Sequence, residues 1–501
     1  MFEGFGVGLG EILQIGTLIT MAVGIVLGII AGSIPGFTIT MAIVLTLPLT
    51  FHMPPIQGIA TMLAVYIGGL TGGMISAALL GIPGTPSSVA TTFDAYPMSR
   101  NGEPGRAMGI GIFASFFGTI LSTIVLVLAA PQLALVAVRL GPWEYFSLIV
   151  FAMTIIASLV GSSMIRGLTA GLIGMFLATI GSDPIMGVQR FSFDLRMLSA
   201  GLPFLAVLIG VFAVSQLLTE VEDLRKVRQG GALISGKIVF QPLRFMMEAV
   251  RRPVNLLRSS LIGVFIGAVP GAGGSIANLL AYDQARRASK TPEKFGTGIP
   301  EGVVASESGN SATASGGLIP LIALGIPGSA VDAVLIAALM VHGISVGPRL
   351  VLDNPDLVYA MFVAMFIGAF MMLVIAMSTM RYFLMVTDIP KHIIVPLVLV
   401  FCVVGVFALN NRLTDVYLLF FVGGLGYLLR KMDYPLAPLV LGVILGPIAE
   451  TNLRRALMTD ADWTLFLTRP ISLGFLVLAV VSVVVFLRHR YRYAAAETSG
   501  S

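Results

Sequence analysis

The residues best suited to bind an anion or a small cation follow two identical Gly-Ile-Pro-Gly sequences, Gly81–Gly84 and Gly325–Gly328. Hydroxyl groups and free backbone amides can bind carboxylate oxygens without a buried cation. The alternative interpretation is a structural kink in which Ser and Thr bond back to the helix. The polar residues in question are Thr85, Ser87 and Ser88 after the first sequence, and Ser329 and Asp332 after the second.

A second polar stretch, Glu301–Gly317, leads directly into the second Gly-Ile-Pro-Gly. It contains Glu307 and Asn310 among many serines in an otherwise apolar region. An ionisable residue at membrane depth usually has a function, so Glu307 could bind a proton or Na⁺, with Asn310 and backbone carbonyls as neutral ligands. The alternative interpretation is that this stretch is an aqueous loop.

Both sites depend on helices that are interrupted. Proline lacks an N–H group and clashes with the preceding turn, so Pro-Gly inside a membrane span exposes backbone carbonyls and amides. Such groups are tolerated at membrane depth only where protein covers them or where they line a wet cavity. Membrane transporters use these breaks to direct half-helix N-termini at anions and unwound carbonyls at cations.

The breaks belong to an internal repeat. GIIAGSIPG (Gly28–Gly36) matches GVFIGAVPG (Gly263–Gly271), and GGMISAALLGIPG (Gly72–Gly84) matches GGLIPLIALGIPG (Gly316–Gly328). Two matches in the same order at nearly one offset predict a duplication. The difference between the two offsets is absorbed by a basic loop, 283–298, in the second half.

The same loop predicts that the two halves have opposite orientations. Residues 283–298 contain four cations, whereas the corresponding stretch of the first half, Thr50–Gly58, contains none. Cations accumulate in cytoplasmic loops. The two stretches are therefore expected on opposite sides of the membrane, an inverted-topology arrangement that is common in secondary transporters.

The composition requires a membrane protein. The chain has 501 residues, of which 56% are hydrophobic and 11% are charged, whereas soluble domains contain about 25% charged residues. We expect an all-α polytopic membrane protein in the lipid bilayer, with about 12 transmembrane helices plus re-entrant or broken helices. The net charge of +5 sits in a few short loops, so nucleic acid is not expected as a partner.

Charge also predicts the order of the domains. The linker and the C-terminal tail are rich in Lys and Arg, so both are expected in the cytoplasm. The loop 450–470 contains three arginines although the number of spans places it outside, so its side is left open. The predicted domains are a first transmembrane repeat (10–217), a cytoplasmic linker (218–258), a second transmembrane repeat (259–487) and a cytoplasmic tail (488–501).

Sequence signatures of catalysis and of metal binding are absent. There is no Gly-x-x-x-x-Gly-Lys-Ser/Thr, no His-Glu-x-x-His and no Gly-x-Ser-x-Gly, so neither an ATPase nor a hydrolase is predicted. Cys402 is the one cysteine, and the four histidines lack ligand spacing. We therefore expect no catalytic residues, no metal site and no cofactor, and the chain is not predicted to be an enzyme.

These motifs resemble the large, TctA-type membrane subunit of tripartite tricarboxylate transporters. The likeness covers roughly residues 10–490 and rests on GSIPGFT, LTLPLTFHMPPIQGIATMLAVYIGG, LLGIPGTPSSVATTFDAYPMSRNGEPGRAMG, GAVPGAGG and GGLIPLIALGIPG. In that family two adjacent asparagines are common where this chain has Asn310 followed by Ser311.

The resemblance implies a secondary transporter of the bacterial inner membrane. Its partners would be a small four-span membrane subunit and a periplasmic solute-binding protein. Its substrate would be a di- or tricarboxylate or a related organic acid. A Na⁺ or H⁺ gradient would drive the import of this substrate. The sequence leaves open whether the chain forms a homo-oligomer, and the alternative function is a channel or a non-transporting membrane scaffold.

Together, the breaks, their polar neighbours and the resemblance predict one substrate site and one ion site. The ion-coupling candidates are Glu307, Asn310 and Asp332. The substrate-binding candidates are Pro35, Gly36, Thr38, Gly84, Thr85, Ser87, Ser88, Gly271, Gly273, Asn310, Gly328 and Ser329.

Overall fold

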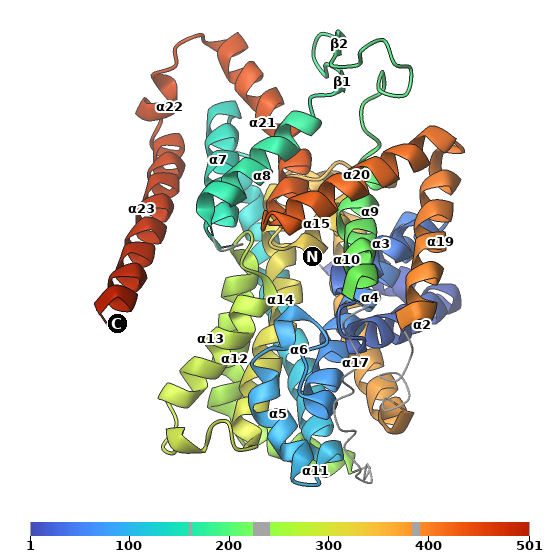
Figure 1. Ribbon diagram of the computed structural model, residues 1–501, viewed down its shortest axis with the longest axis vertical. Helices are drawn as coiled ribbons and strands as arrows, with labels where there is room; N and C mark the ends of the chain where they lie inside the picture. Colours follow the sequence, from blue (N-terminus) through green and yellow to red (C-terminus); the bar gives the residue numbers. More distant parts are fainter. Residues whose placement is uncertain (1, 160–162, 224–240, 383–390, 500–501) are drawn as a thin grey trace. The chain divides into compact units, whose positions relative to one another are not determined.

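The computed structural model describes residues 2–159, 163–223, 241–382 and 391–499 (Figure 1). Residues 224–240 of the predicted linker and 500–501 of the predicted tail lie outside this part of the chain. Nearly all regular structure in the described residues is helical. The strands described are the two short ones β1 (Gly181–Ser182) and β2 (Gln189–Arg190), which pair antiparallel. The predicted all-α class is confirmed.

The chain forms two compact units, each built from two separate segments. The first unit comprises residues 1–135 and 212–411, and the second comprises 136–211 and 412–501. The predicted domains divide the chain by repeat, at the linker 218–258, whereas these units divide it by packing. The repeat boundaries therefore stay a prediction.

The first unit holds both halves of the repeat. Its elements are α1 (Phe2–Ile12), α2 (Ile15–Ser33), α3 (Ile39–Thr50), α4 (Pro55–Leu80), the 3-10 turn η1 (Pro86–Ser88), α5 (Thr91–Arg100), most of α6 (Pro104–Ala137), α10 (Ser215–Asp223), α11 (Pro242–Val250), α12 (Pro253–Ala268), α13 (Gly273–Arg287), η3 (Pro292–Lys294), α14 (Pro300–Leu324), α15 (Ala330–Val341), α16 (Leu350–Asp353), α17 (Pro355–Thr379), η4 (Met380–Tyr382) and α19 (Lys391–Asn410).

The second unit is smaller. Its elements are α7 (Pro142–Leu159), α8 (Met164–Leu177), β1, β2, α9 (Phe204–Ile209), α20 (Leu413–Lys431), α21 (Leu436–Thr459), α22 (Leu465–Thr468) and α23 (Pro470–Ser499). A π-helical turn, η2 (Gly210–Val214), connects α9 to α10.

The helices identify a multi-pass membrane protein. Among the described residues, eight helices are long and apolar enough to cross a bilayer, and six shorter apolar helices accompany them. The predicted total of about 12 spans therefore stays a prediction. The eight are Ile15–Ser33, Pro55–Leu80, Pro104–Ala137, Pro142–Leu159, Phe204–Glu222, Pro355–Tyr382, Leu413–Lys431 and Leu436–Thr459.

In the first half, α2 packs on α4 through glycines that bring the two backbones into contact. A Cβ at Gly28 would meet the Val65 carbonyl, and a Cβ at Gly32 would meet the Gly69 carbonyl. From the other side, a Cβ at Gly72 would meet the Ile29 carbonyl. Small residues that permit close backbone approach are typical of helix pairs in membranes.

In the second half, α12 packs on α14 at the corresponding positions. A Cβ at Gly263 would meet the Gly309 carbonyl, and one at Gly267 would meet the Thr313 carbonyl. A Cβ at Gly316 would meet the Val264 carbonyl. The sequence offsets that align the two halves therefore also align their helix contacts.

Both long helices end in the same way. Gly81 ends α4 at φ 68° and Gly325 ends α14 at φ 72°, which is the left-handed conformation that glycine adopts without strain. These are the first residues of the two Gly-Ile-Pro-Gly sequences. After each break the chain turns into a short helical element, η1 in the first half and α15 in the second.

Three basic segments of the first unit gather at one end, near α5 and α11 at the bottom of Figure 1. Arg106, at the start of α6, contacts Glu248 of α11 at 2.8 Å. Arg252 contacts Glu301, at the start of α14, at 2.6 Å. The described end of the predicted cytoplasmic linker, 241–258, therefore contacts the starts of α6 and α14.

The second unit contains two buried carboxylates, Glu144 and Asp183, that pair with partly exposed arginines. Arg469 pairs with Glu144 of α7 at 2.7 Å, and its guanidinium lies over the Trp143 ring. Arg454 pairs with Asp183 at 2.7 Å and with Glu450 at 2.9 Å. Two of the three arginines in 450–470 therefore have carboxylate partners.

Candidate functional site

The first break carries a compact group of hydroxyls. The Thr85 hydroxyl lies 3.0 Å from the hydroxyls of both Ser87 and Ser88. All three side chains are buried. Gly73 of α4 makes room for this group, because a Cβ there would collide with Thr85 and Ser88. The first break thus presents hydroxyl groups inside the protein, away from lipid.

The second break carries a carboxylate in the corresponding place. Ser329 caps the N-terminus of α15 and donates a 2.7 Å hydrogen bond to Asp332 Oδ2. Gly317 makes room for Asp332, as Gly73 does for Ser88. The Gly271 N–H also donates to the Gly328 carbonyl at 2.8 Å, which joins the break after α12 to the break after α14.

Helix α14 places the polar stretch in the interior. Residues 301–317 are helical, and nearly every side chain of α14 is buried. The alternative of an aqueous loop is therefore wrong. Glu307 accepts hydrogen bonds from Thr91 of α5 and, at 3.2 Å, from Ser115 of α6. No ion pair to Glu307 is present among the described residues.

Several buried polar atoms of α14 and α15 lack partners. The Asn310 side chain faces Glu307, but neither of its polar atoms forms a hydrogen bond of good geometry within the described residues, and Ser311 Oγ and Asp332 Oδ1 also lack partners there. All three side chains are buried. Leaving a buried polar group unsatisfied costs about 1–3 kcal/mol, so these atoms are suited to bind a water, an ion or a substrate group.

Asn310 meets residues of both halves beside Gly274. A Cβ at Gly274 would lie 2.7 Å from Asn310 Oδ1 and 2.8 Å from the Ser87 Cβ. Gly274 is therefore the small residue that lets the first break approach α14. The Tyr66 side chain of α4 also lies near Ser329 and Thr313 of the second half.

The structure brings most of the predicted substrate-binding residues into this region. Thr85, Ser87 and Ser88 lie on the first break, and Gly328 and Ser329 lie on the second. The Gly271 N–H donates to the Gly328 carbonyl. A Cβ at Gly273 would lie 3.8 Å from the Ser329 Cβ. Gly84 packs against Gly32 and Ser76 next to the first break.

The break after α2 has different neighbours. Thr38 caps α3 by accepting a 3.2 Å hydrogen bond from Met41 N. The Gly36 carbonyl accepts from Gln216 at 3.0 Å, and Pro35 lies beside it in a small pocket against α10. Among the contacts of the described residues, none joins these three to Asn310, so their role in binding stays a prediction.

Asn278 of α13 holds neighbouring elements together, and the sequence alone gives only a weak indication of this role. Its Oδ1 accepts from Ala90 N at 2.6 Å, and its Nδ2 donates to Thr91 Oγ1 at 3.2 Å and to the Ser306 carbonyl at 3.0 Å. It therefore ties α5 to α14 beside Glu307. Its position in a half-polar helix after a Pro-Gly is the signal that points to it.

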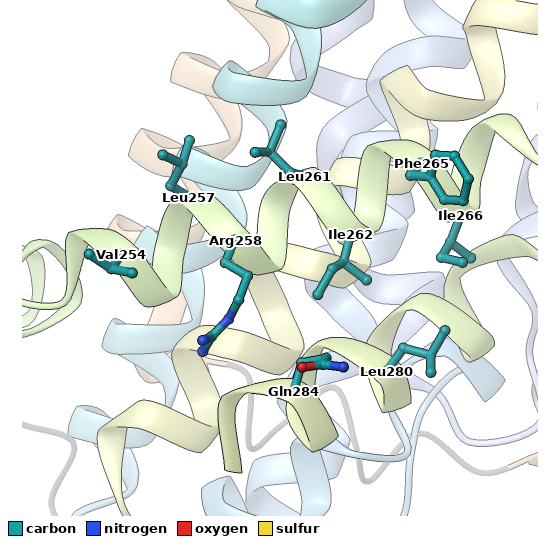
Figure 2. Close-up of a pocket in the computed structure, with 9 residues that line it drawn as sticks. All are labelled: Val254, Leu257, Arg258, Leu261, Ile262, Phe265, Ile266, Leu280 and Gln284. Carbon is teal, nitrogen blue, oxygen red and sulfur yellow. The ribbon is translucent and has the colours of Figure 1, made fainter. Parts of the chain in front are cut away.

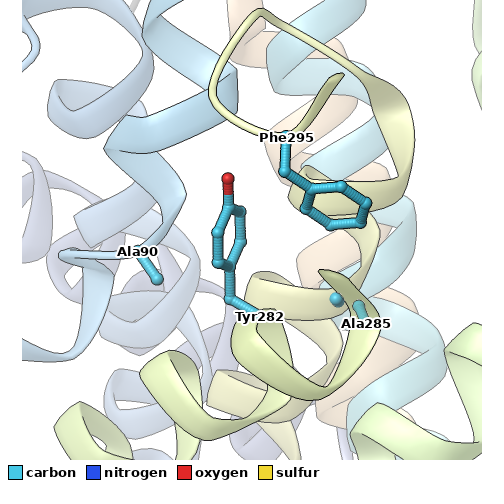
Figure 3. Close-up of a cluster of buried hydrophobic side chains, with 5 residues drawn as sticks. Ala90, Tyr282, Ala285 and Phe295 are labelled. Atoms are coloured by element: carbon cyan, nitrogen blue, oxygen red, sulfur yellow. The ribbon is translucent and has the colours of Figure 1, made fainter. Parts of the chain in front are cut away.

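Asp94 of α5 fixes the entry to α14. Its carboxylate accepts from the N–H groups of Gly298 at 2.8 Å and Ile299 at 3.0 Å, and from the Tyr282 hydroxyl at 2.9 Å. Burial raises the pKa of this carboxyl above its usual value, while these hydrogen bonds hold the pKa down. Figure 3 shows Tyr282 beside Phe295 in the adjoining apolar cluster.

The site as described contains no cluster that resembles a metal centre. Within the described residues, no group of three or more His, Cys, Asp or Glu side chains is placed to hold a metal ion. Glu307 and Asp332 each have hydroxyl neighbours instead. The arrangement offers neutral hydrogen-bond donors and acceptors from both breaks and two buried carboxylates.

Comparison with known proteins gives a consistent result. Residues 18–441 match the family described as "Tripartite tricarboxylate transporter TctA family". A protein of Agrobacterium vitis described as "Uncharacterized 52.8 kDa protein in TAR-I ttuC' 3'region" is 34% identical over 450 residues, which cover 89% of this chain and 88% of that protein. A second, "Uncharacterized protein in TAR-II ttuC' 3'region", is 35% identical over 226 residues, 45% of this chain and 93% of that protein. No solved structure matches this chain.

Proposed function

This chain belongs to the TctA family of tripartite tricarboxylate transporters, and on that premise we propose that it moves an organic carboxylate across the bilayer by secondary active transport. The family is one of transport proteins, so the chain is a component of a tripartite transport system. The proposed substrate class is di- and tricarboxylates or related organic acids. The proposed energy source is a Na⁺ or H⁺ gradient.

The observation that carries this proposal is the set of unpartnered polar atoms at Asn310 and Ser311. They are buried in α14, and Asn310 lies close to Ser87 of the first break, because a Cβ at Gly274 would meet both side chains. A carboxylate can accept hydrogen bonds from amide and hydroxyl donors, and the N-terminus of α15 adds a favourable dipole. Neutral donors suit an anion that must also leave the site after each cycle.

Glu307 and Asp332 are the proposed coupling residues. Both are buried, and no cation pairs with either among the described residues. An isolated buried carboxylate is costly, so each is expected to hold a proton or a cation. Binding of Na⁺ or H⁺ at these carboxylates would reduce the negative charge of the site and favour the entry of an anionic substrate.

We further propose that the two halves are inverted repeats that move around this site. The matched contacts of α2 with α4 and of α12 with α14 support a duplication. In such transporters, access alternates as one part of the repeat moves against the rest. We place the basic end of the first unit and the C-terminus in the cytoplasm of a bacterial inner membrane, by the positive-inside rule.

The proposed partners are a small four-span membrane subunit and a periplasmic solute-binding protein. The test is uptake of labelled di- and tricarboxylates by membrane vesicles that contain the chain and both partners, with a Na⁺ gradient, an H⁺ gradient or neither. Saturable uptake that requires one gradient is expected. Downhill flux without saturation would indicate a channel, and uptake that is unchanged without this chain would indicate a scaffold.

A further inference from the structure

An apolar groove runs along the outer surface between α12 and α13, with a volume of about 590 Å³. Figure 2 shows its lining, which includes Leu257, Leu261, Ile262 and Phe265 of α12. The Phe265 side chain is 71% exposed. Exposed apolar side chains of this kind face hydrocarbon in a membrane protein.

A basic pocket adjoins one end of the groove, with a volume of about 610 Å³. Val254 and Arg258 line both, and the basic pocket adds Arg251, Arg252 and Lys290. Arg252 is neutralised by Glu301 at 2.6 Å. Within the described residues no carboxylate pairs with Arg251, Arg258 or Lys290, so the pocket keeps a strong positive charge.

Arg258 joins the two pockets and lacks a full set of partners. Its Nη2 donates to Asn255 at 3.3 Å, but its buried Nε has no hydrogen-bond partner among the described residues. In Figure 2 its side chain extends from α12 toward Gln284 of α13. A guanidinium in this position is able to bind an anionic oxygen at the head of the groove.

We propose that one anionic phospholipid binds here, with its phosphate at Arg258 and Lys290 and an acyl chain in the groove. The apolar groove begins where the charged pocket ends, which matches the order of headgroup and chain in a lipid. Basic pockets between membrane helices on the cytoplasmic side are known to bind anionic headgroups. A soluble phosphate would leave the groove unused, and a zwitterionic lipid would leave the charge unbalanced.

The first test uses the full-length chain, purified in detergent and stripped of lipid. It is titrated with dioleoyl phosphatidylglycerol, dioleoyl phosphatidylcholine or inorganic phosphate, and binding is followed by native mass spectrometry. Saturable binding of one phosphatidylglycerol, about tenfold tighter than phosphatidylcholine, is expected. Equal binding of the two lipids, or equal competition by inorganic phosphate, would overturn the proposal.

A pair of variants locates the binding site. Arg258→Gln is expected to weaken phosphatidylglycerol binding about fivefold, the effect of one cation near an anionic headgroup. Arg287→Gln is the matched control, because Arg287 pairs with Asp283 on α13 and lines neither pocket. Equal losses in the two variants would mean that only general charge is involved.

A photo-crosslinker at position 265 identifies the occupant in native membranes. Phe265→p-benzoylphenylalanine is expected to give an adduct with the mass of a phospholipid. An adduct with the small membrane subunit or with a second copy of the chain would show that protein covers the groove and would contradict the proposal.

Discussion

Two buried asparagines in the first unit differ in their hydrogen bonding. Asn278 makes hydrogen bonds to Ala90, Thr91 and Ser306, whereas both polar atoms of Asn310 lack partners within the described residues. A fully bonded amide stabilises the fold. An unpartnered amide lowers stability and is retained where a ligand needs it.

Replacing the two residues by alanine is therefore expected to separate function from stability. Asn310→Ala should lower carboxylate uptake about tenfold and change the melting temperature in detergent little, because the amide faces Glu307 without forming a hydrogen bond of good geometry in the fold. Asn278→Ala should lower the free energy of unfolding by about 2–4 kcal/mol, because Thr91 and the backbone lose their partners. A clear fall in melting temperature for Asn310→Ala, with normal uptake, would identify Asn310 as structural.

Asp183 gives the second unit a pH-dependent stability. The N–H groups of Met186 and Ile185, and then Arg454, lower the pKa of its carboxyl to about 2. The unfolded value is about 3.9, so the charged form stabilises the fold. This contribution is present above pH 4 and is lost as the pH falls toward 2.

The melting temperature of the purified protein should thus fall between pH 4 and pH 2 more steeply in wild type than in Asp183→Asn. Thermal unfolding in a detergent that is stable at low pH measures this difference. Parallel curves for the two proteins would show that the hydrogen bonds to Asp183 do not contribute.

At the scale of the elements, close backbone contact between paired helices is the main constraint. Gly267 faces the Thr313 carbonyl, to which a Cβ would come within 2.7 Å, and Gly32 faces the Gly69 carbonyl. Neither neighbour is the flexible end of a side chain. An added methyl group must therefore separate the helices.

Gly32→Ala and Gly267→Ala are each expected to lower the free energy of unfolding by about 1–3 kcal/mol, with similar loss in the two halves. Gly424→Ala in α20 is the matched control, because a Cβ there meets nothing within 4 Å. It should be neutral or slightly stabilising, since alanine favours a helix. Unequal effects at Gly32 and Gly267 would speak against equivalent roles for the two helix pairs.

The sequence predicted the elements better than their partners. Pro-Gly and Gly-x-x-x-Gly mark breaks and close helix packing by residue type alone, so the matched motifs were visible in advance. Ser115 and Tyr66 were not identified, because one polar residue in an apolar helix does not indicate what it faces. The two units were also missed, since the second combines α8 with α21, which are far apart in the chain.

At the scale of the whole molecule, the account requires the two halves to enter the membrane from opposite sides. Pro55→Cys and Lys290→Cys, in a chain in which Cys402 is replaced by Ala, occupy exposed positions at the start of α4 and in the loop before α14. A membrane-impermeant thiol reagent added to intact cells should label position 55 and not position 290. Labelling of both positions from the same side would contradict the inverted topology.

The central claim is that the carboxylate binds between the two breaks, and substrate protection of Ser87→Cys in the Cys402→Ala chain tests it most directly. Ser378→Cys, on the exposed end of α17, is the control. With the transported carboxylate at ten times its dissociation constant, the rate of thiol modification at position 87 should fall about tenfold and the rate at position 378 should not change. Equal modification rates at position 87 with and without substrate would contradict the account.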